Sequence, residues 1–425
     1  MSSYHLNDVA ISIEKQGPSR MAKTSFPIRY GKYSEIKTAE YEFIFNLNGE
    51  IKFIRGLNVN WPHPSERLKR TDGNDWVYYS VGDDSSENGI ISWLGEYYLP
   101  CLPYPGNAVW EYNYFSNPNI MNAFAAWSQL YANLQGARTE GQPSKVKDFI
   151  NLICGSDESV LYEKSQRLRG IIGGRVSVLP PDARYADYEI IPLIIADGCL
   201  YHCKFCCVKS SQAFQRRSET DIIEQIRQLK AFYGRNLENY NALFLGNHDA
   251  LGAGDETIFM AVSEAVKAFG FAEPRAKTPM LFMFGSVDSL LKAGDEFMSE
   301  LNRLPFYTYI NIGLESVDAP TLAHIHKPLD PSKIREAFGK MLEINRTFAN
   351  VEITANFLLG KELSPDHYQS LAELLHDAPA PSRGKGAIYL SPLKDSPKKR
   401  ELLPLFFEIK KQSRIAAYIY LIQRL

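Results

Sequence analysis

The sequence predicts an α/β protein whose main part is a partial TIM-like barrel, (β/α)6, with an α+β region before it and a helix after it. Three observations predict this fold class. Short apolar runs alternate with amphipathic segments from about residue 186 onward. The apolar runs are nearly continuous, as in parallel strands that helices cover. Six such strands are too few to close the usual eight-stranded barrel, so we expect a partial one.

The predicted barrel alternates strands and helices. One helix begins after Ser218, which can cap its first turn, and stops at Gly234. Another helix over 255–269 ends at Gly270. The six strands are predicted at 188–196, 242–246, 280–285, 308–315, 351–360 and 387–393.

The first 185 residues have a different texture from the barrel. All five tryptophans lie here, among clusters of turn-forming residues. Two runs rich in β-branched and aromatic residues flank Asn48-Gly49 and predict a hairpin, and a helix is expected over 119–135. The aromatic side chains either fill the core of this region or line a substrate pocket that the region covers.

The chain of 425 residues is long enough for two or three compact parts. We expect an aromatic-rich α+β region at 1–185 and the barrel at 186–395. The last segment, 396–425, contains ELLPLFFEIKKQSRIAAYIYLIQRL. Its pattern is interpreted as an amphipathic helix that packs on the barrel.

Composition narrows the possible partners and the compartment. The formal net charge is −2, which argues against general nucleic-acid binding. No apolar run approaches the roughly 20 residues of a membrane span. The N-terminus lacks a basic segment followed by an apolar one, so we expect a cytoplasmic protein whose thiols stay reduced.

Ligands of parallel α/β folds bind at the carboxyl ends of the strands. A cluster of four cysteines begins directly after the first predicted strand, whereas Cys101 and Cys154 stand alone. The other strand ends that could share a site with this cluster are Gly246–Asp249, Gly285–Asp288, Gly313–Ser316, Asn356–Gly360 and Ser391.

Cys199, Cys203 and Cys206 have the spacing C-x3-C-x2-C. Three thiolates on one short loop can hold three corners of an iron-sulfur cube, which leaves the fourth iron open to a small chelating molecule. A zinc site completed by His202 or Cys207 is an alternative, although this spacing is unusual for zinc. A thiol redox or structural loop is another.

The cysteine spacing, with Phe205 before the third cysteine and a βα pattern around it, resembles the radical S-adenosylmethionine (SAM) superfamily. Four segments resemble its oxygen-independent coproporphyrinogen oxidase and methylthiotransferase-like branch in order and spacing. They are ADGCLYHCKFCCVKS, RRSETDIIEQIRQL, LFLGNHDAL and INIGLESVDAPTLAHIHKP. The resemblance covers residues 186–393, and it identifies no subfamily.

The resemblance implies that Cys199, Cys203 and Cys206 bind a [4Fe-4S] cluster whose unique iron is chelated by SAM. The segment 246–249 stands where the family often has Gly-Gly-Glu, so a carboxylate role there would pass to Asp249. The implied SAM contacts lie in the cysteine loop and at strand ends. They are Phe205, Gly246, Asn247, His248, Asp249, Ser286, Asp288, Glu315 and Asn356.

The implied reaction is reductive cleavage of SAM to a 5′-deoxyadenosyl radical, which abstracts hydrogen from a small-molecule substrate in an oxygen-sensitive enzyme. A low-potential donor such as flavodoxin or ferredoxin would supply the electron. The motifs assign no catalytic residue and no substrate. Two alternatives stay open: modification of a peptide or protein side chain, and an iron-sulfur binding or electron-transfer protein that does not cleave SAM.

Overall fold

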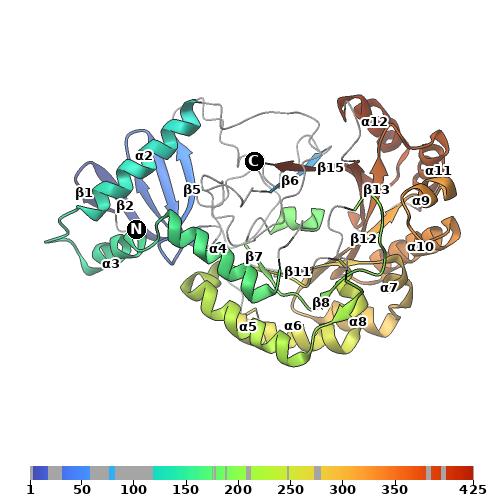
Figure 1. Ribbon diagram of the computed structural model, residues 1–425, viewed down its shortest axis with the longest axis horizontal. Coiled ribbons are helices and arrows are strands. Elements are labelled where there is room, and N and C mark those ends of the chain that lie inside the picture. Colours follow the sequence, from blue (N-terminus) through green and yellow to red (C-terminus); the bar gives the residue numbers. More distant parts are fainter. Residues whose placement is uncertain are drawn as a thin grey trace.

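The computed structural model describes residues 3–17, 31–57, 76–81, 118–174, 176, 179–186, 189–206, 212–246, 248–271, 279–379, 384–393 and 399–424. Figure 1 shows a small antiparallel sheet with three helices at one end of the molecule. A larger parallel sheet lies toward the other end, with helices along its outer side. In the described part of the chain, no helix is both long and apolar enough to cross a membrane.

The small sheet has five antiparallel strands in sequence order. The predicted hairpin is confirmed, because β4 and β5 pair across a turn at Asn48-Gly49. Gly49 has φ +79°, and a Cβ there would lie 2.8 Å from the backbone carbon of Leu152, so this turn requires glycine. The strands are β1 (Ser3–Leu6), β2 (Val9–Gln16), β3 (Lys32–Lys37), β4 (Tyr41–Phe45) and β5 (Ile51–Gly56).

Three helices accompany this sheet, and the first confirms the helix expected over 119–135. The ring of Trp127 lies 5.7 Å from Phe43 and 5.6 Å from Phe45, so this tryptophan fills the core. The side chains of the other four tryptophans lie outside the described residues. The helices are α2 (Pro118–Gln135), α3 (Ser144–Cys154) and α4 (Glu158–Ile172).

The parallel sheet has eight strands, in the order β6-β15-β14-β13-β12-β11-β10-β7. The six predicted runs are all strands of this sheet, so the predicted α/β architecture is confirmed. No pairing joins the edge strands β6 and β7 within the described residues, so the sheet is open there. The six strands are β7 (Ile190–Pro192), β10 (Ala242–Phe244), β11 (Met280–Gly285), β12 (Tyr307–Glu315), β13 (Val351–Leu359) and β14 (Ala387–Pro392).

Helices follow most strands, as the alternating pattern predicts. Ser218 caps α5 by accepting a hydrogen bond from the Asp221 backbone N–H at 3.1 Å. The helices are α5 (Glu219–Tyr233), α6 (Asp255–Phe269), α7 (Val287–Lys292), α8 (Asp295–Arg303), α9 (Ala319–His324), α10 (Pro331–Thr347) and α11 (Pro365–His376).

The prediction of one C-terminal helix over 396–425 is wrong. Helix α12 covers only Leu403–Gln412, and β15 (Ala416–Arg424) follows it. The β15 strand pairs in parallel with β14 on one side and with β6 (Trp76–Val81) on the other. Alternating aromatic and β-branched residues favour a strand here, and the strand covers an edge of β14 that would otherwise be open.

A short helical segment, η5 (Gly234–Asn239), joins the small sheet to the parallel sheet. The Asn239 side chain accepts from the Lys32 backbone N–H and donates to the Lys32 carbonyl oxygen, both at 2.8 Å. The Asn48 side chain donates to the Tyr233 carbonyl oxygen at 3.0 Å. Because these side-chain bonds satisfy backbone groups of the opposite part, they fix how the two sheets are placed.

Candidate functional site

The cysteine loop begins two residues after β8 (Ala196–Asp197), which pairs with β9 (Gln215–Arg216). The chain enters the cysteine loop at Gly198, whose φ is +76°. A Cβ at this position would lie 2.2 Å from the carbonyl oxygen of Ala213, so the close approach admits only glycine. The glycine therefore sets the direction in which the loop leaves the sheet.

All three predicted ligands lie on this loop, and none of them is in a disulfide bond. Cys203 is buried, whereas Cys199 and Cys206 are partly exposed. Burial raises the pKa of the Cys199 and Cys203 thiols, and the nearby ammonium of Lys327 opposes that effect at both. The Lys204 backbone N–H donates to the Ile325 carbonyl oxygen at 2.8 Å, which ties the loop to the end of α9.

Three thiols on one short loop are the donor set that a [4Fe-4S] cluster needs. Among the residues that the structure describes, no three His, Cys, Asp or Glu side chains are placed to hold a single metal ion. Cys207 and Asn247, which sequence patterns also brought into consideration, lie outside the described residues.

Tyr201 connects the loop to two helices. Its hydroxyl donates a short hydrogen bond to Asp288, and the Asp288 backbone N–H donates back to the same oxygen at 3.2 Å. Lys333 of α10 pairs with the other carboxylate oxygen of Asp288. Burial and the Asp288 carboxylate raise the pKa of the Tyr201 phenol. Asp288 was predicted to contact SAM. In the structure its side chain connects the cysteine loop to α7 and α10.

Asp249 and Ser286 form a buried network between the ends of β10 and β11. The Asp249 carboxylate accepts from the backbone N–H groups of Ser286 at 2.9 Å and Gly252 at 3.2 Å, and from the Ser289 hydroxyl at 2.7 Å. The Ser286 hydroxyl accepts from the Ser289 backbone N–H at 3.0 Å. These side chains are thus engaged in capping and positioning, which the sequence prediction of cofactor contacts did not foresee.

Glu315 lies at the end of β12, where the pairing with β13 shifts by a bulge. It is 9% exposed and has φ +70°, an unfavourable value for a residue with a side chain. Burial raises the pKa of its carboxyl, and Lys327 opposes the shift. Gly313 makes room for this side chain, because a Cβ at Gly313 would lie 2.3 Å from Glu315 Oε1.

Lys327 is a residue that sequence reasoning missed. Its ammonium is buried, donates to the Gly313 carbonyl oxygen at 2.7 Å and lies 3.9 Å from Glu315 Oε1. The same ammonium lies 5.0 Å from the centre of the Tyr201 ring. In the sequence Lys327 stands in the text HIHKP, directly after His326, and the two histidines of that text are exposed whereas Lys327 is buried.

Ser316, next to Glu315, is held by His367 of α11. The Ser316 hydroxyl lies 2.7 Å from His367 Nδ1, and His367 Nε2 lies 3.1 Å from the Leu358 carbonyl oxygen. Because a carbonyl only accepts, Nε2 carries the proton and Nδ1 accepts from the serine. Burial lowers the pKa of His367, which keeps the imidazole neutral.

Asn356 faces Asn311 of the neighbouring strand. The Asn356 side chain donates to Asn311 Oδ1 at 2.6 Å, and Asn311 in turn donates to Thr354 Oγ1 at 2.9 Å. The network continues to Asp182, which accepts from Thr354 at 2.7 Å and from Tyr389 at 2.6 Å. Asn356 therefore belongs to a polar row across β12, β13 and β14.

The remaining predicted contacts that the structure describes are Phe205, Gly246 and His248. Phe205 packs partly buried against the main hydrophobic core. Gly246 has φ +134°, and a Cβ there would lie 4.0 Å from the Ala196 carbonyl oxygen of β8. His248 follows β10 and is half-buried.

Residues 193–375 match the family model of the radical SAM superfamily. The match covers less than half of the chain. It includes all three cysteines, every predicted SAM contact and Lys327. The radical SAM superfamily uses a [4Fe-4S] cluster and SAM.

Several solved structures are similar to part of the chain. A radical SAM methyltransferase from Sphaerobacter thermophilus is 14% identical, with a TM-score of 0.36 over 54% of this chain and 66% of that one. The methyltransferase TsrM from Kitasatospora setae, with cobalamin and a [4Fe-4S] cluster bound, is 12% identical, with a TM-score of 0.32 over 47% and 36%. Methylornithine synthase is 12% identical, with a TM-score of 0.32 over 60% and 77%.

The chain thus spans less than two thirds of the length of the first two of these structures. No curated protein matches it.

Proposed function

We propose that the chain holds a [4Fe-4S] cluster through Cys199, Cys203 and Cys206 within a partial barrel, and cleaves SAM to act on a small molecule. The observation that carries this proposal is the single loop of three cysteines, none in a disulfide bond, inside the segment that matches the radical SAM family model. When bound, the cluster supplies an electron that cleaves SAM to a 5′-deoxyadenosyl radical, which abstracts hydrogen from the substrate. The electron would come from a low-potential donor such as flavodoxin or ferredoxin.

The residues around the loop then supply charge and shape. Lys327 offsets the negative charge of the thiolates, because its ammonium is buried and favours the charged form of both Cys199 and Cys203. Glu315, held beside Lys327, offers a carboxylate that can orient polar groups of SAM. Asn356 offers an amide to adenine or ribose from the next strand. These contacts hold the reacting atoms close together and exclude water.

The direct test is anaerobic reconstitution with iron and sulfide, followed by reduction in the presence of SAM. The wild-type protein is expected to turn brown and to release 5′-deoxyadenosine. Cys203→Ser is expected to lose the cluster and the product. Cys154→Ser is the matched control. Cys154 is also outside any disulfide bond, but it lies on α3 beside the small antiparallel sheet. A cluster-loaded wild type that never forms 5′-deoxyadenosine would support the electron-transfer alternative instead.

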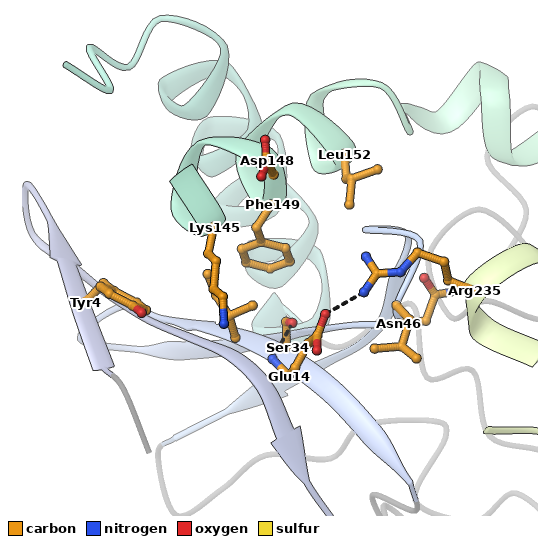
Figure 2. Close-up of a pocket in the computed structure, with 11 residues that line it drawn as sticks. Tyr4, Glu14, Ser34, Asn46, Lys145, Asp148, Phe149, Leu152 and Arg235 are labelled. Atoms are coloured by element: carbon orange, nitrogen blue, oxygen red, sulfur yellow. Dashed lines mark hydrogen bonds and ion pairs between the residues drawn. The ribbon is translucent and has the colours of Figure 1, made fainter. Parts of the chain in front are cut away.

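A second candidate function is modification of a peptide or protein side chain, and a cavity in the N-terminal region favours it. Figure 2 shows this cavity between the small sheet and α3. Its volume is about 300 Å³. The Phe149 ring and the Lys145 side chain point from α3 toward the sheet, and Glu14 pairs with Arg235 at 2.6 Å beside them. The cavity therefore combines an apolar wall with charged groups.

The small sheet and β8, which leads into the cysteine loop, lie in separate parts of the molecule (Figure 1). A ligand that occupies both the cavity and the cysteine loop must be long and extended, as a peptide is. Lys145→Glu is expected to weaken binding of fluorescein-labelled acidic peptides, measured by anisotropy. Lys147→Glu is the control, because Lys147 lies on the same helix but does not line the cavity. Equal loss in both variants would indicate a general charge effect and would count against this function.

A further inference from the structure

We propose that Tyr201 is a positioning residue that holds the cysteine loop in its cluster-binding shape before the cluster is present. This inference rests on the proposed ligation by Cys199, Cys203 and Cys206. It adds Tyr201, which acts through its hydroxyl and the Asp288–Lys333 pair. We call the linked set Tyr201, Asp288 and Lys333 the loop clamp.

The first support is the place of Tyr201 in the chain. It lies two residues after Cys199 and two residues before Cys203. Cys199 is also fixed locally, because the Tyr201 backbone N–H donates to its Sγ at 3.4 Å. An anchor at Tyr201 thus restrains both thiols through short stretches of backbone, with few rotatable bonds in between.

The second support is the geometry of the anchor. The Tyr201 hydroxyl both donates to the Asp288 carboxylate and accepts from the Asp288 backbone N–H. The other carboxylate oxygen is engaged by Lys333, so the carboxylate stays charged and correctly turned. Asp288 belongs to the first turn of α7 and Lys333 to the first turn of α10. The loop is therefore tied to two helices of the domain.

The third support is that the ring of Tyr201 is held as well as its hydroxyl. Lys327 lies over the ring at 5.0 Å and is itself fixed by the Gly313 carbonyl oxygen at 2.7 Å. Tyr201 is thereby linked to α7 and α10 through its hydroxyl and, through Lys327, to the end of β12. Neither the contacts of the Tyr201 hydroxyl nor those of its ring use a cysteine thiol, so the clamp is complete without the cluster.

A clamp of this kind lowers the cost of binding, because the loop is ordered in advance. Removing the hydroxyl should leave the fold and the three thiols in place while the loop becomes free to move. Hydrogen bonds to charged groups contribute enough that loss of one is expected to speed local opening about tenfold.

The test begins with the protein before cluster loading. Hydrogen exchange of the segment 199–206 is expected to be about tenfold faster in Tyr201→Phe than in the wild type. Asp288→Asn is expected to show the same increase, and the double variant no more than either single one. Lys333→Arg keeps the ion pair, so exchange of 199–206 is expected to stay near the wild-type rate. Lys333→Met removes the ion pair and is expected to raise that rate.

The control is Tyr307→Phe. The Tyr307 hydroxyl also donates to a carboxylate, that of Glu352 at 2.8 Å, but at the opposite end of β12 from Glu315. This variant loses a comparable bond and is expected to leave exchange of 199–206 unchanged. If it changes that exchange as much as Tyr201→Phe does, the effect is general destabilisation and the inference is wrong.

A second readout uses the loaded protein. The EPR spectrum of the reduced cluster is expected to change on SAM addition in the wild type and Tyr307→Phe, and to change less or heterogeneously in Tyr201→Phe. Unchanged exchange and an unchanged EPR response in Tyr201→Phe, with the cluster still lost in Cys203→Ser, would overturn the clamp and leave the proposed function standing. A wild type that takes up no cluster would overturn the proposed function, and the exchange measurement would then still decide whether Tyr201 orders the loop.

Discussion

Lys327 and Glu315 form a buried ion pair, with Nζ 3.9 Å from Oε1 and side chains only 4% and 11% exposed. The distance is too long for a hydrogen bond, which explains why burial still raises the pKa of the Glu315 carboxyl. Lys327 instead gives its hydrogen bond to the Gly313 carbonyl oxygen. The lysine thus stabilises the end of β12 and faces the cysteine loop at the same time.

Replacing Lys327 with methionine is expected to cost about 3 kcal/mol of unfolding free energy, because Glu315 is left buried without its counter-charge. Urea unfolding measures this loss. Lys267→Met is the control, since Lys267 pairs with Glu264 on the surface of α6 at 2.7 Å with side chains 67% and 39% exposed. Its loss is expected to stay below about 1 kcal/mol. Equal losses in the two variants would show that the buried pair has no special role.

The Lys327 variant is also expected to hold its cluster less well. Without the ammonium, only backbone hydrogen bonds oppose the rise that burial causes in the pKa of the Cys199 and Cys203 thiols, so less of each thiol is present as thiolate. Iron retained per chain after gel filtration, compared between wild type and Lys327→Met at pH 7 and pH 9, measures this effect. The deficit is expected to shrink at the higher pH, and a constant deficit would contradict the charge argument.

His367 predicts how stability depends on pH. Its side chain is 0% exposed, and burial lowers the pKa of its imidazole below the ordinary value of 6.5. The folded protein therefore binds a proton less readily than the unfolded chain does. The contribution of neutral His367 to the free energy of unfolding is complete above pH 6.5. It is lost as the pH falls from there through the pKa of His367 in the folded protein.

Urea unfolding of wild type and His367→Gln across pH 5 to 8 checks this prediction. The wild type is expected to lose unfolding free energy more steeply below pH 6.5 than the variant does. His376→Gln is the control, because the His376 side chain is 61% exposed. A wild-type profile parallel to that of His367→Gln would show that His367 does not cause the slope.

Local patterns predicted much of this structure. Apolar runs located the six strands, and Ser218 and Gly234 located the ends of α5, because each signal acts over a few residues. The spacing of the cysteines located the loop for the same reason. The sequence did not predict that the second half of the C-terminal segment forms strand β15, because this strand depends on pairing with the edges of β14 and β6.

Side-chain roles at the strand ends were harder to predict than the strands. Asp249 follows β10, which made it a candidate for the cofactor, but its partners Ser286 and Ser289 lie 37 and 40 residues further along the chain. Asp182 likewise bonds to Thr354 and Tyr389, at separations of 172 and 207 residues. Such partnerships depend on which strands become neighbours, and no local pattern records that.

Gly313 provides a prediction about the shape of the site. A Cβ at this position would lie 2.3 Å from Glu315 Oε1 and 3.8 Å from Lys327 Nζ. Gly313→Ala must therefore move the Glu315 carboxylate. The backbone of Glu315 is already at φ +70°. The expected cost is about 1–3 kcal/mol of unfolding free energy, as for other changes that crowd a packed site.

The matched control for Gly313→Ala is Gly339→Ala. Gly339 lies within α10, and a Cβ there would meet no heavy atom within 4 Å. Because alanine favours a helix over glycine, this variant is expected to gain up to about 1 kcal/mol. If Glu315 orients SAM, Gly313→Ala should also weaken SAM binding by equilibrium dialysis while Gly339→Ala does not. A Gly313→Ala protein that is destabilised but binds SAM normally would remove Glu315 from the proposed SAM contacts.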